Sequence, residues 1–516
     1  MASTTERPDE PRSVHPRIYR YRGAVRVVLV STYELGHQPL HVASPAGALL
    51  RAGHEVRCTD LAIDPFDGEM LSWADAVACS VPMHTALRLA RPVCREIRAR
   101  RPDIALCLYG LYAGLDGAED GAPVADLAIA GEYEPRLVAW VNCLAAAPGA
   151  SVAEHGAGGR TMVELGRGRF GLPARHLLPG LDRYARLALG NERRLVGYVE
   201  ASHGCAHRCR HCPVPVVYDG RTRLVADDAV VADVAQLVAM GARHITFGDP
   251  DFLNGPHHAA RVIDAVHNSF PDLTFDVTVK VEHILRHRDV FPRMGAAGCL
   301  FAVSAFESAS DHILEQLDKG HTAAEECDAV AVLRSAGIEP RPSLLPFTPW
   351  TRSEDVFALL DLVAHCDLVG NVDPVQYSIR LLVPPGSLLV TSGRLDGRLD
   401  EYDDEHLGWS WRAPDPRLDE LQGRIADVAE RAAAGEWSAQ ESYDAVRVAA
   451  VAVLGEGPAH SAAAPEPDPR LRSSIPADER PRLTEAWFCC AEPSGAQLAA
   501  VEIQDWAPTP VVAGGK

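Results

Sequence analysis

The sequence predicts an α/β protein built from two successive arrays of parallel strands, followed by a helical and flexible C-terminal tail. Short β-branched runs alternate with helical stretches up to about residue 148, and a second alternation of six candidate strands begins at residue 196. Strands that alternate with helices are typical of parallel sheets. At 516 residues the chain is also too long for one ordinary hydrophobic core, so several domains are expected.

The first array, residues 23–148, predicts a doubly wound, Rossmann-like sheet. Its candidate strands are 25–30, 55–58, 76–80 and 104–109, with helical stretches at 43–51 and 85–100. Such sheets bind ligands at the carboxyl ends of their strands. Here those ends are followed by residues 31–38, 80–84, 110–114 and 131–134.

The second array, residues 196–394, predicts a partial (β/α)6 barrel with its active site at the carboxyl ends of the strands. The candidate strands are 196–201, 244–247, 273–279, 300–305, 341–347 and 375–382. The remaining segments are expected to be a disordered N-terminus (1–22), a connector (149–195), a helical extension (395–455), and a flexible linker with a Cys-Cys tail (456–516).

Composition narrows the class of protein. The net charge of -20 argues against a nucleic-acid partner, since such proteins usually carry a basic excess. The first 22 residues contain no apolar signal core, and no run of apolar residues is long enough for a membrane span. A cytoplasmic protein with reduced thiols is therefore expected. Eight scattered cysteines are then interpreted as small buried apolar residues: Cys58, Cys79, Cys94, Cys107, Cys143, Cys299, Cys327 and Cys366.

Three other cysteines form a motif directly after the first barrel strand. Cys205, Cys209 and Cys212 have the spacing C-x3-C-x2-C, which supplies three of the four iron ligands of a 4Fe-4S cluster and leaves one iron open. The alternative is structural zinc with His203, His207 or His211 as the fourth ligand. Zinc sites usually pair two C-x-x-C knuckles, and the sequence has no second knuckle.

The motif, its place after the first strand and about 190 following residues resemble the radical SAM superfamily. The resemblance implies one 4Fe-4S cluster held by Cys205, Cys209 and Cys212, with S-adenosylmethionine (SAM) as the cosubstrate that chelates the fourth iron. Family members usually carry an aromatic residue just before the third cysteine. His211 stands there in this chain, which leaves the adenine contact undefined.

The resemblance also suggests further SAM-binding residues. Asp249, after the second strand, is the candidate for the SAM amino group, with a loop-capping role as the alternative. Glu307 and Ser308, after the fourth strand, resemble the family's Glu-Ser pair, with Glu307 at the ribose hydroxyls, and Lys319-Gly320 completes the spacing. Arg380 is a candidate for the SAM carboxylate or for an internal salt bridge.

The first array resembles the cobalamin-binding domain that precedes many radical SAM barrels, including its Gly131-Glu132-Tyr133-Glu134 turn. The D-x-H-x-x-G motif that ligates cobalt in some cobalamin proteins is absent. His37 and His41 lie in a suitable loop, and some family members bind cobalamin without a protein ligand. Cobalamin is therefore a candidate cofactor.

The tail motif Trp487-Phe488-Cys489-Cys490-Ala491-Glu492-Pro493 resembles that of the CUAEP/CCAEP-tail radical SAM proteins, some of which carry selenocysteine at the position of Cys490. Selenium or sulfur at one position suggests a soft nucleophile or metal ligand. Cys489 and Cys490 are thus candidate catalytic residues that present a thiophilic acceptor such as arsenic. A vicinal disulfide, a buried apolar plug and no specific role are the alternatives.

Three functions follow. The first is transfer of a SAM-derived group to a thiophilic acceptor, and the second is cobalamin-dependent methylation of a small metabolite. The third is a non-catalytic, thiol-rich metal-binding or sensor protein. The expected partners are a small-molecule or inorganic acceptor and a reductant such as flavodoxin or ferredoxin, with no nucleic acid and no membrane.

Overall fold

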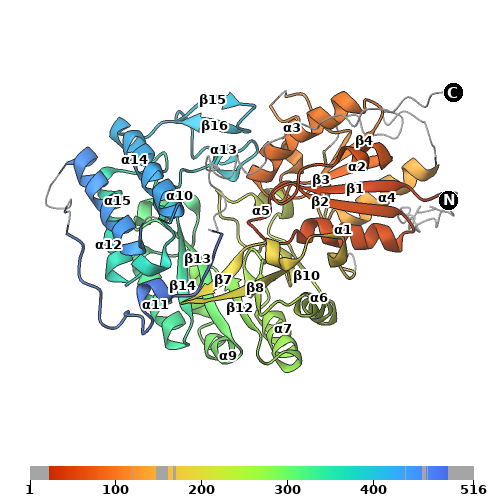
Figure 1. Cartoon of the computed structure of the whole chain (residues 1–516). Helices are drawn as coiled ribbons and strands as arrows, with labels where there is room; N and C mark the ends of the chain where they lie inside the picture. Colours follow the sequence, from red (N-terminus) through yellow and green to blue (C-terminus); the bar gives the residue numbers. More distant parts are fainter. Residues whose placement is uncertain are drawn as a thin grey trace, which may run out of the picture.

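The computed structural model describes residues 23–119, 121–146, 161–166, 170–435, 437–455, 461 and 463–485. Two parallel sheets lie beside each other, the first red to orange and the second yellow to green in Figure 1. The C-terminal helices pack on the side of the second sheet that faces away from the first (Figure 1). No helix in the described part of the chain is long and apolar enough to cross a membrane.

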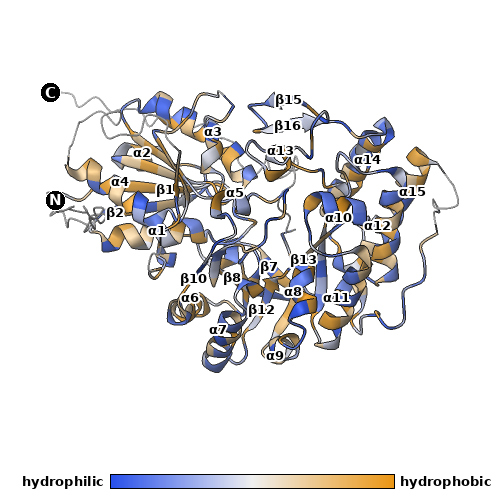
Figure 2. Ribbon diagram, turned by 180° about the vertical axis from the view of Figure 1, so that it is seen from behind, coloured by the Kyte–Doolittle hydropathy of each residue, from blue (hydrophilic) through white to orange (hydrophobic). Residues whose placement is uncertain are grey.

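The first sheet has six parallel strands in the order β2-β1-β3-β4-β5-β6. The order reverses beside β1, which opens a crevice at the carboxyl ends of the strands. The strands of this sheet are among the most hydrophobic segments (Figure 2), because helices cover both faces. The bounds are β1 (Arg26–Ser31), β2 (Glu55–Asp60), β3 (Ala76–Ser80), β4 (Ala105–Tyr109), β5 (Leu127–Gly131), β6 (Thr161–Glu164), α1 (Leu40–Arg51), α2 (Gly68–Trp73), α3 (His84–Arg100) and α4 (Glu134–Ala146).

The second sheet curls into a half-barrel in the order β14-β13-β12-β11-β8-β7-β17, and its first five strands in that order are parallel. Both sheets confirm the predicted fold class. The strands are β7 (Arg186–Leu189), β8 (Glu192–Val199), β11 (His244–Phe247), β12 (Thr274–Thr278), β13 (Cys299–Glu307), β14 (Glu339–Leu344) and β17 (Arg482–Leu483). The helices are α6 (Asp227–Ala239), α7 (Pro256–Ser269), α8 (Val281–Arg286), α9 (Phe291–Ala296), α10 (Asp311–Leu317), α11 (Ala323–Ser335) and α12 (Ser353–His365).

The predicted sixth barrel strand, 375–382, is wrong. The chain forms a 3-10 helix at Pro374–Ser378, and the bridge between Phe347 and Arg380 lies outside the strands of the sheet. The Gln376 side chain accepts a hydrogen bond from the Leu344 amide at 3.0 Å. This amide lies at the edge of the sheet, and in a six-stranded sheet it would donate to the backbone of the next strand.

Three other segments differ from expectation. The expected connector contributes β6 to the first sheet and β7 to the second. Both strands are held by backbone hydrogen bonds to a neighbouring strand, so side-chain periodicity did not reveal them. The expected helical extension begins with a hairpin, β15 (Leu399–Asp403) and β16 (Gly408–Trp411), before α14 (Pro416–Ala433) and α15 (Ala439–Leu454).

The described part of the expected flexible linker, residues 463–482, packs on the barrel. Leu471 is buried, and Arg480 donates to Asp367 at 2.8 Å and to Asn371 at 2.6 Å. The chain then pairs as β17 with β7. Its polar composition misled the prediction because arginine contacts, rather than apolar residues, hold most of this segment in place.

The scattered cysteines follow the prediction only in part. Cys79, Cys94, Cys107 and Cys299 are buried free thiols, whereas Cys58 is half-buried and Cys143 is exposed. Cys327 and Cys366 form a disulfide, because α11 and the residue after α12 lie side by side with the two Cα atoms 6.1 Å apart. Sequence spacing alone gave no sign of this pair.

Candidate active site

A cavity of 330 Å³ lies between the two sheets, at the carboxyl ends of their strands. All four predicted strand-end segments of the first sheet line it. They contribute Glu34, Leu35 and His37 after β1, Pro82, Met83, His84 and Thr85 after β3, Gly110, Leu111 and Tyr112 after β4, and Gly131 and Tyr133 after β5.

The half-barrel forms the opposite wall. Side chains alternate along each strand, so every second residue points into the barrel. The residues of this wall include the charged Asp276 and Lys280 and the apolar Phe301 and Val303. Residues at the mouth of the half-barrel complete this wall, among them Glu200, Asp249, Glu307 and Lys319.

Cys205, Cys209 and Cys212 line this cavity on one loop between β9 (Ser202–Gly204) and α5 (Val214–Tyr218). Gly204 precedes the first cysteine with φ +74°, where any side chain would collide with the Arg221 carbonyl oxygen. Arg210 fixes the middle of the loop, because its guanidinium donates to the carbonyls of Glu315 and Gln316 at 2.8 and 2.9 Å.

Burial affects the ionisation of two of the three thiols. Burial raises the pKa of Cys205 to about 12 and also raises the pKa of Cys209. The thiolate forms that ligate iron are therefore stable here only with a cation close by, and a bound metal ion supplies that charge. It remains a prediction that the cluster ligands are Cys205, Cys209 and Cys212. The chemistry of the loop is compatible with this prediction.

The histidines of the zinc alternative are engaged elsewhere. His203 Nδ1 lies 3.1 Å from Glu132, His207 Nε2 lies 3.5 Å from Asp251, and His211 Nε2 lies 3.2 Å from Glu307. Within the described ranges, the one group of side chains with single-ion spacing is that of His207, Asp251 and His283, and it includes no cysteine. The structure therefore gives no support to a zinc site made of these cysteines and a histidine.

Two of the predicted SAM residues lie in the cavity. Asp249 accepts hydrogen bonds from the Ala201 amide at 2.9 Å and the Ser202 hydroxyl at 2.5 Å, and burial raises its pKa to about 7. Asp249 thus caps the loop that leads to the cysteines, and it also faces the cavity. Glu307 lies on the same cavity wall, 3.1 Å from Lys319.

The other two lie outside the residues that line the cavity. The Ser308 hydroxyl accepts a hydrogen bond from the Ser310 amide at 3.3 Å. Arg380 pairs with Asp419 at 2.6 Å and stacks 3.7 Å above the Trp411 ring, which is the internal salt bridge of the alternative prediction.

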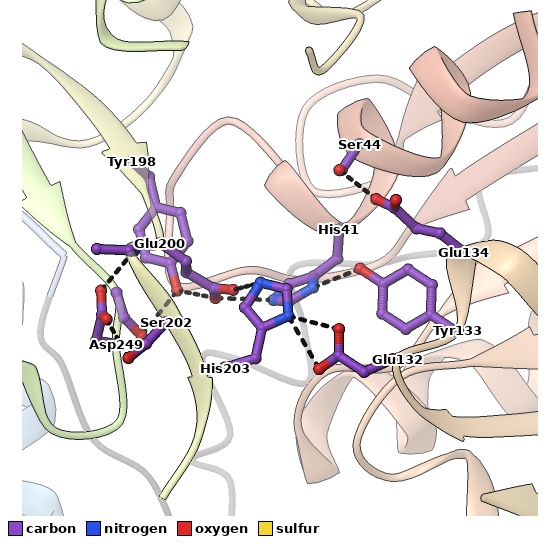
Figure 3. A network of polar contacts seen from close by, with 12 residues as sticks. His41, Ser44, Glu132, Tyr133, Glu134, Tyr198, Glu200, Ser202, His203 and Asp249 are labelled. Atoms are coloured by element: carbon purple, nitrogen blue, oxygen red, sulfur yellow. Dashed lines mark hydrogen bonds and ion pairs between the residues drawn. The ribbon is translucent and has the colours of Figure 1, made fainter. Parts of the chain in front are cut away.

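A buried polar network joins the two sheets (Figure 3). Glu200, after β8, lies between His41 of the first sheet at 3.3 Å and His203 at 3.2 Å, and His203 reaches back to Glu132. Burial alone would raise the pKa of Glu200 and lower that of each histidine. The attraction of Glu200 for His41, and of Glu132 and then Glu200 for His203, outweighs burial, so the pKa of Glu200 is held at about 2 and those of both histidines at about 9.

The two histidines considered as cobalt ligands, His41 and His37, lie in or beside this network. Both ring nitrogens of His41 are engaged, Nδ1 with the Tyr133 hydroxyl at 2.8 Å and Nε2 with Glu200. The His37 ring packs 4.9 Å from Tyr198, and burial lowers its pKa to about 4. Sequence reasoning missed Glu200 because no motif marks it.

Cys489 and Cys490 lie outside the described residues. The described chain leads toward the cavity, since Leu483 of β17 and Glu485 both line it. The Tyr33 hydroxyl, in the loop after β1, donates to Glu485 at 2.6 Å. The strand β17 therefore leads the described chain, up to Glu485, to the boundary between the two sheets.

A half-barrel with this cysteine loop at its mouth defines the class of radical SAM enzymes. Residues 199–360 match the Radical SAM superfamily, so this part of the chain is a radical SAM domain. The sequence resemblance to that superfamily is thereby confirmed, while the resemblance of the tail remains a prediction.

Curated relatives are distant. An uncharacterized methyltransferase of Pyrococcus horikoshii is 25% identical over 214 residues, covering 41% of this chain and 44% of the relative. Hopanoid C-3 methylase of Methylococcus capsulatus is 22% identical over 329 residues, covering 61% and 62%. A tRNA-2-methylthio-N(6)-dimethylallyladenosine synthase of Pseudoalteromonas atlantica is 21% identical over 294 residues, covering 53% and 55%. The chain thus spans about half the length of the curated relatives it matches.

Solved structures resemble both domains. The cobalamin-dependent SAM radical enzyme OxsB with aqua-cobalamin bound superposes with a TM-score of 0.64 at 11% identity, covering 84% of this chain and 74% of that one. The radical SAM methyltransferase TsrM from Kitasatospora setae has a TM-score of 0.50 at 19% identity, covering 66% and 70%. At these identities the likeness shows a shared fold.

Proposed function

We propose that the protein is a cobalamin-dependent radical SAM transferase that methylates a small metabolite. In this proposal Cys205, Cys209 and Cys212 hold a 4Fe-4S cluster, SAM lies at the barrel mouth, and cobalamin lies against the first sheet. The observation that carries the proposal is the single cavity walled by the cysteine loop on one side and by four strand-end loops on the other.

The wall formed by the first sheet suits a large, flat cofactor. Its loops after β3 and β4 present Pro82, Met83, Leu111 and Tyr112, together with Gly110, which has no side chain to project. Apolar and aromatic surfaces of this kind bind extended ring systems. The structural neighbours OxsB and TsrM, which share the fold, are a cobalamin-dependent SAM radical enzyme and a radical SAM methyltransferase.

When bound, the cluster supplies the electron for SAM cleavage, and cobalamin supplies a cobalt centre able to carry a methyl group. The chain itself binds and orients these groups. The cysteine loop fixes the iron ligands, and Asp249 presents a buried carboxyl beside the loop. The cavity lies between the two sheets, and a site walled on two sides limits the side reactions of radical intermediates with water.

The test is anaerobic reconstitution with iron and sulfide, then reduction with dithionite in the presence of SAM and analysis of the SAM products by mass spectrometry. We expect S-adenosylhomocysteine and 5′-deoxyadenosine, both dependent on added cobalamin. Products that form equally well without cobalamin would contradict the cobalamin part of the proposal. A protein that assembles no cluster would contradict all of it.

The path of the C-terminal segment favours a second candidate, transfer of a SAM-derived group to a thiophilic acceptor such as arsenite. Glu485 stands at the cavity, and Cys489 and Cys490 follow it by four and five residues. An extended chain of that length spans up to about 18 Å, enough to bring either thiol into the cavity. Soft thiols suit such an acceptor.

This candidate predicts a product that depends on both arsenite and the thiols. Methylthioadenosine formed only with arsenite, and lost in Cys490→Ser and Cys489→Ser, would support it. Cys143→Ser is the matched control, because Cys143 is exposed and does not line the cavity. No arsenite-dependent product in the wild type would contradict it.

A further inference from the structure

Lysine is almost absent from this chain, and its positions are informative. Of 50 basic residues only three are lysines, namely Lys280, Lys319 and the C-terminal Lys516, which lies outside the described residues. The other two are both buried, and both line the active-site cavity. Where arginine is the usual basic residue, two lysines at one site indicate a need for a compact ammonium rather than a planar guanidinium.

Lys280 contacts the first half of the cysteine loop. It follows β12, and its Nζ lies 3.3 Å from Nδ1 of His207, the residue midway between Cys205 and Cys209. The same ammonium lies 3.3 Å from Glu282, which is one-quarter exposed. The neutralising carboxylate is thus on the solvent side, and the ammonium faces the loop.

Lys319 contacts the second half of the loop through one carboxylate. Its Nζ lies 3.1 Å from Glu307 Oε1, and the same oxygen lies 3.2 Å from Nε2 of His211, the residue before Cys212. Glu307 has φ +69°, a left-handed conformation that a side chain rarely adopts, at the irregular end of β13. Such a conformation persists only where surrounding contacts enforce it.

The two lysines approach the cysteine loop at different points. Lys280 contacts His207, between Cys205 and Cys209, and Lys319 reaches His211, next to Cys212, through Glu307. Burial would lower the pKa of Lys319, but Glu307 outweighs it and raises that pKa, so this ammonium stays charged. Two basic side chains therefore flank the loop that carries the motif.

We propose that Lys280 and Lys319 are positioning residues that set the reduction potential of the cluster. The proposal rests on the proposed function, because it requires a cluster on Cys205, Cys209 and Cys212. Reduction adds one electron from an external reductant and breaks no bond. A nearby positive charge favours the state with the added electron, so the lysines make the potential less negative.

The experiment is a dithionite titration of the reconstituted protein at fixed potentials, followed by electron paramagnetic resonance of the reduced cluster. In Lys319→Met and Lys280→Met we expect the midpoint potential to move to more negative values, and further in the double variant. Lys319→Arg should restore part of the shift, since it restores the charge. Arg424→Met is the control, because it removes an exposed charge that pairs with Glu420 on the same helix.

Glu307→Gln tests the sign in the opposite direction. It leaves Lys319 without its carboxylate, so we expect a less negative midpoint potential, and this result does not depend on how well a methionine packs. Unchanged potentials in all variants that hold wild-type iron would overturn the inference. Unchanged potentials with weaker SAM binding in the lysine variants would also overturn it and assign the lysines to SAM. A wild type without a cluster would remove the proposed function as well, an outcome distinct from the others.

Discussion

The two walls of the cavity differ in secondary structure and in polarity. The wall from the first sheet consists of loops after strands, and it is largely apolar around Met83, Leu111 and Tyr112. The wall from the half-barrel carries the cysteines and most of the charged groups, including Asp249, Lys280, Glu307 and Lys319 at its mouth. The comparison teaches that the half-barrel is suited to small charged groups, whereas the first sheet is suited to a broad apolar one.

The largest effect is expected when a cysteine of the half-barrel wall is removed. Cys209→Ala should lose nearly all iron after anaerobic reconstitution, because two remaining thiolates do not hold a cluster. Iron and sulfide analysis and the visible absorption of the cluster measure this. Cys143→Ala should retain wild-type iron, since Cys143 is exposed. Full iron binding in Cys209→Ala would show that the motif is not the cluster site.

A charge placed on the other wall tests the first sheet separately. Leu111→Glu should weaken cobalamin binding at least about tenfold, because a carboxylate loses hydration against an apolar ring at a cost of about 1.4 kcal/mol or more. Equilibrium dialysis measures the affinity, and iron content is measured in parallel, because Leu111 also packs against the cluster of residues that contains Cys205. The control is Leu172→Glu, at an exposed leucine that does not line the cavity. Equal affinities in both variants would place cobalamin elsewhere.

The network that joins the walls should contribute to stability. Glu200→Gln leaves His41 and His203 without their shared carboxylate in a buried setting, and we expect a loss of about 3 kcal/mol in the free energy of unfolding. Urea unfolding measures the loss. Glu55→Gln, at an exposed glutamate of β2, should change little. A loss below about 1 kcal/mol would mean that the two walls are held by packing alone.

The same network predicts how stability depends on pH. His41 and His203 have pKa values raised to about 9, so their contribution is complete below the usual value of 6.5 and is lost as pH rises through 9. Glu200 is held at about 2, so its contribution is present above 4.5 and is lost as pH falls toward 2. The free energy of unfolding should therefore decline on both sides of a plateau at about pH 5–6. Glu200→Gln should flatten the alkaline decline, and an equal decline in this variant would contradict the assignment.

The smallest effect concerns a residue of neither wall. Arg380→Met removes a partly exposed pair with Asp419 and a stacking contact with Trp411, so we expect a loss of about 1 kcal/mol or less. SAM affinity, measured by isothermal titration calorimetry, should not change. A clear drop in SAM affinity would restore the alternative role at the SAM carboxylate.

Local patterns determined much of the first wall and the key motif of the second. The strand-end loops of the first sheet follow from the alternation of strands and helices, because parallel strands place their carboxyl ends at one edge. The cysteine motif is equally local, since Cys205 and Cys212 are seven residues apart on one loop. Such features depend on neighbours in sequence, so they can be read from the sequence.

Only the tertiary structure decided which distant residues meet. No pattern in the chain links Glu200 to His41, Lys319 to His211 through Glu307, or Gln376 to the edge of the sheet. Tyr33 and Glu485, which are 452 positions apart, bring the C-terminal segment to the cavity. These contacts depend on how two folded sheets face each other, and short-range periodicity does not encode that arrangement.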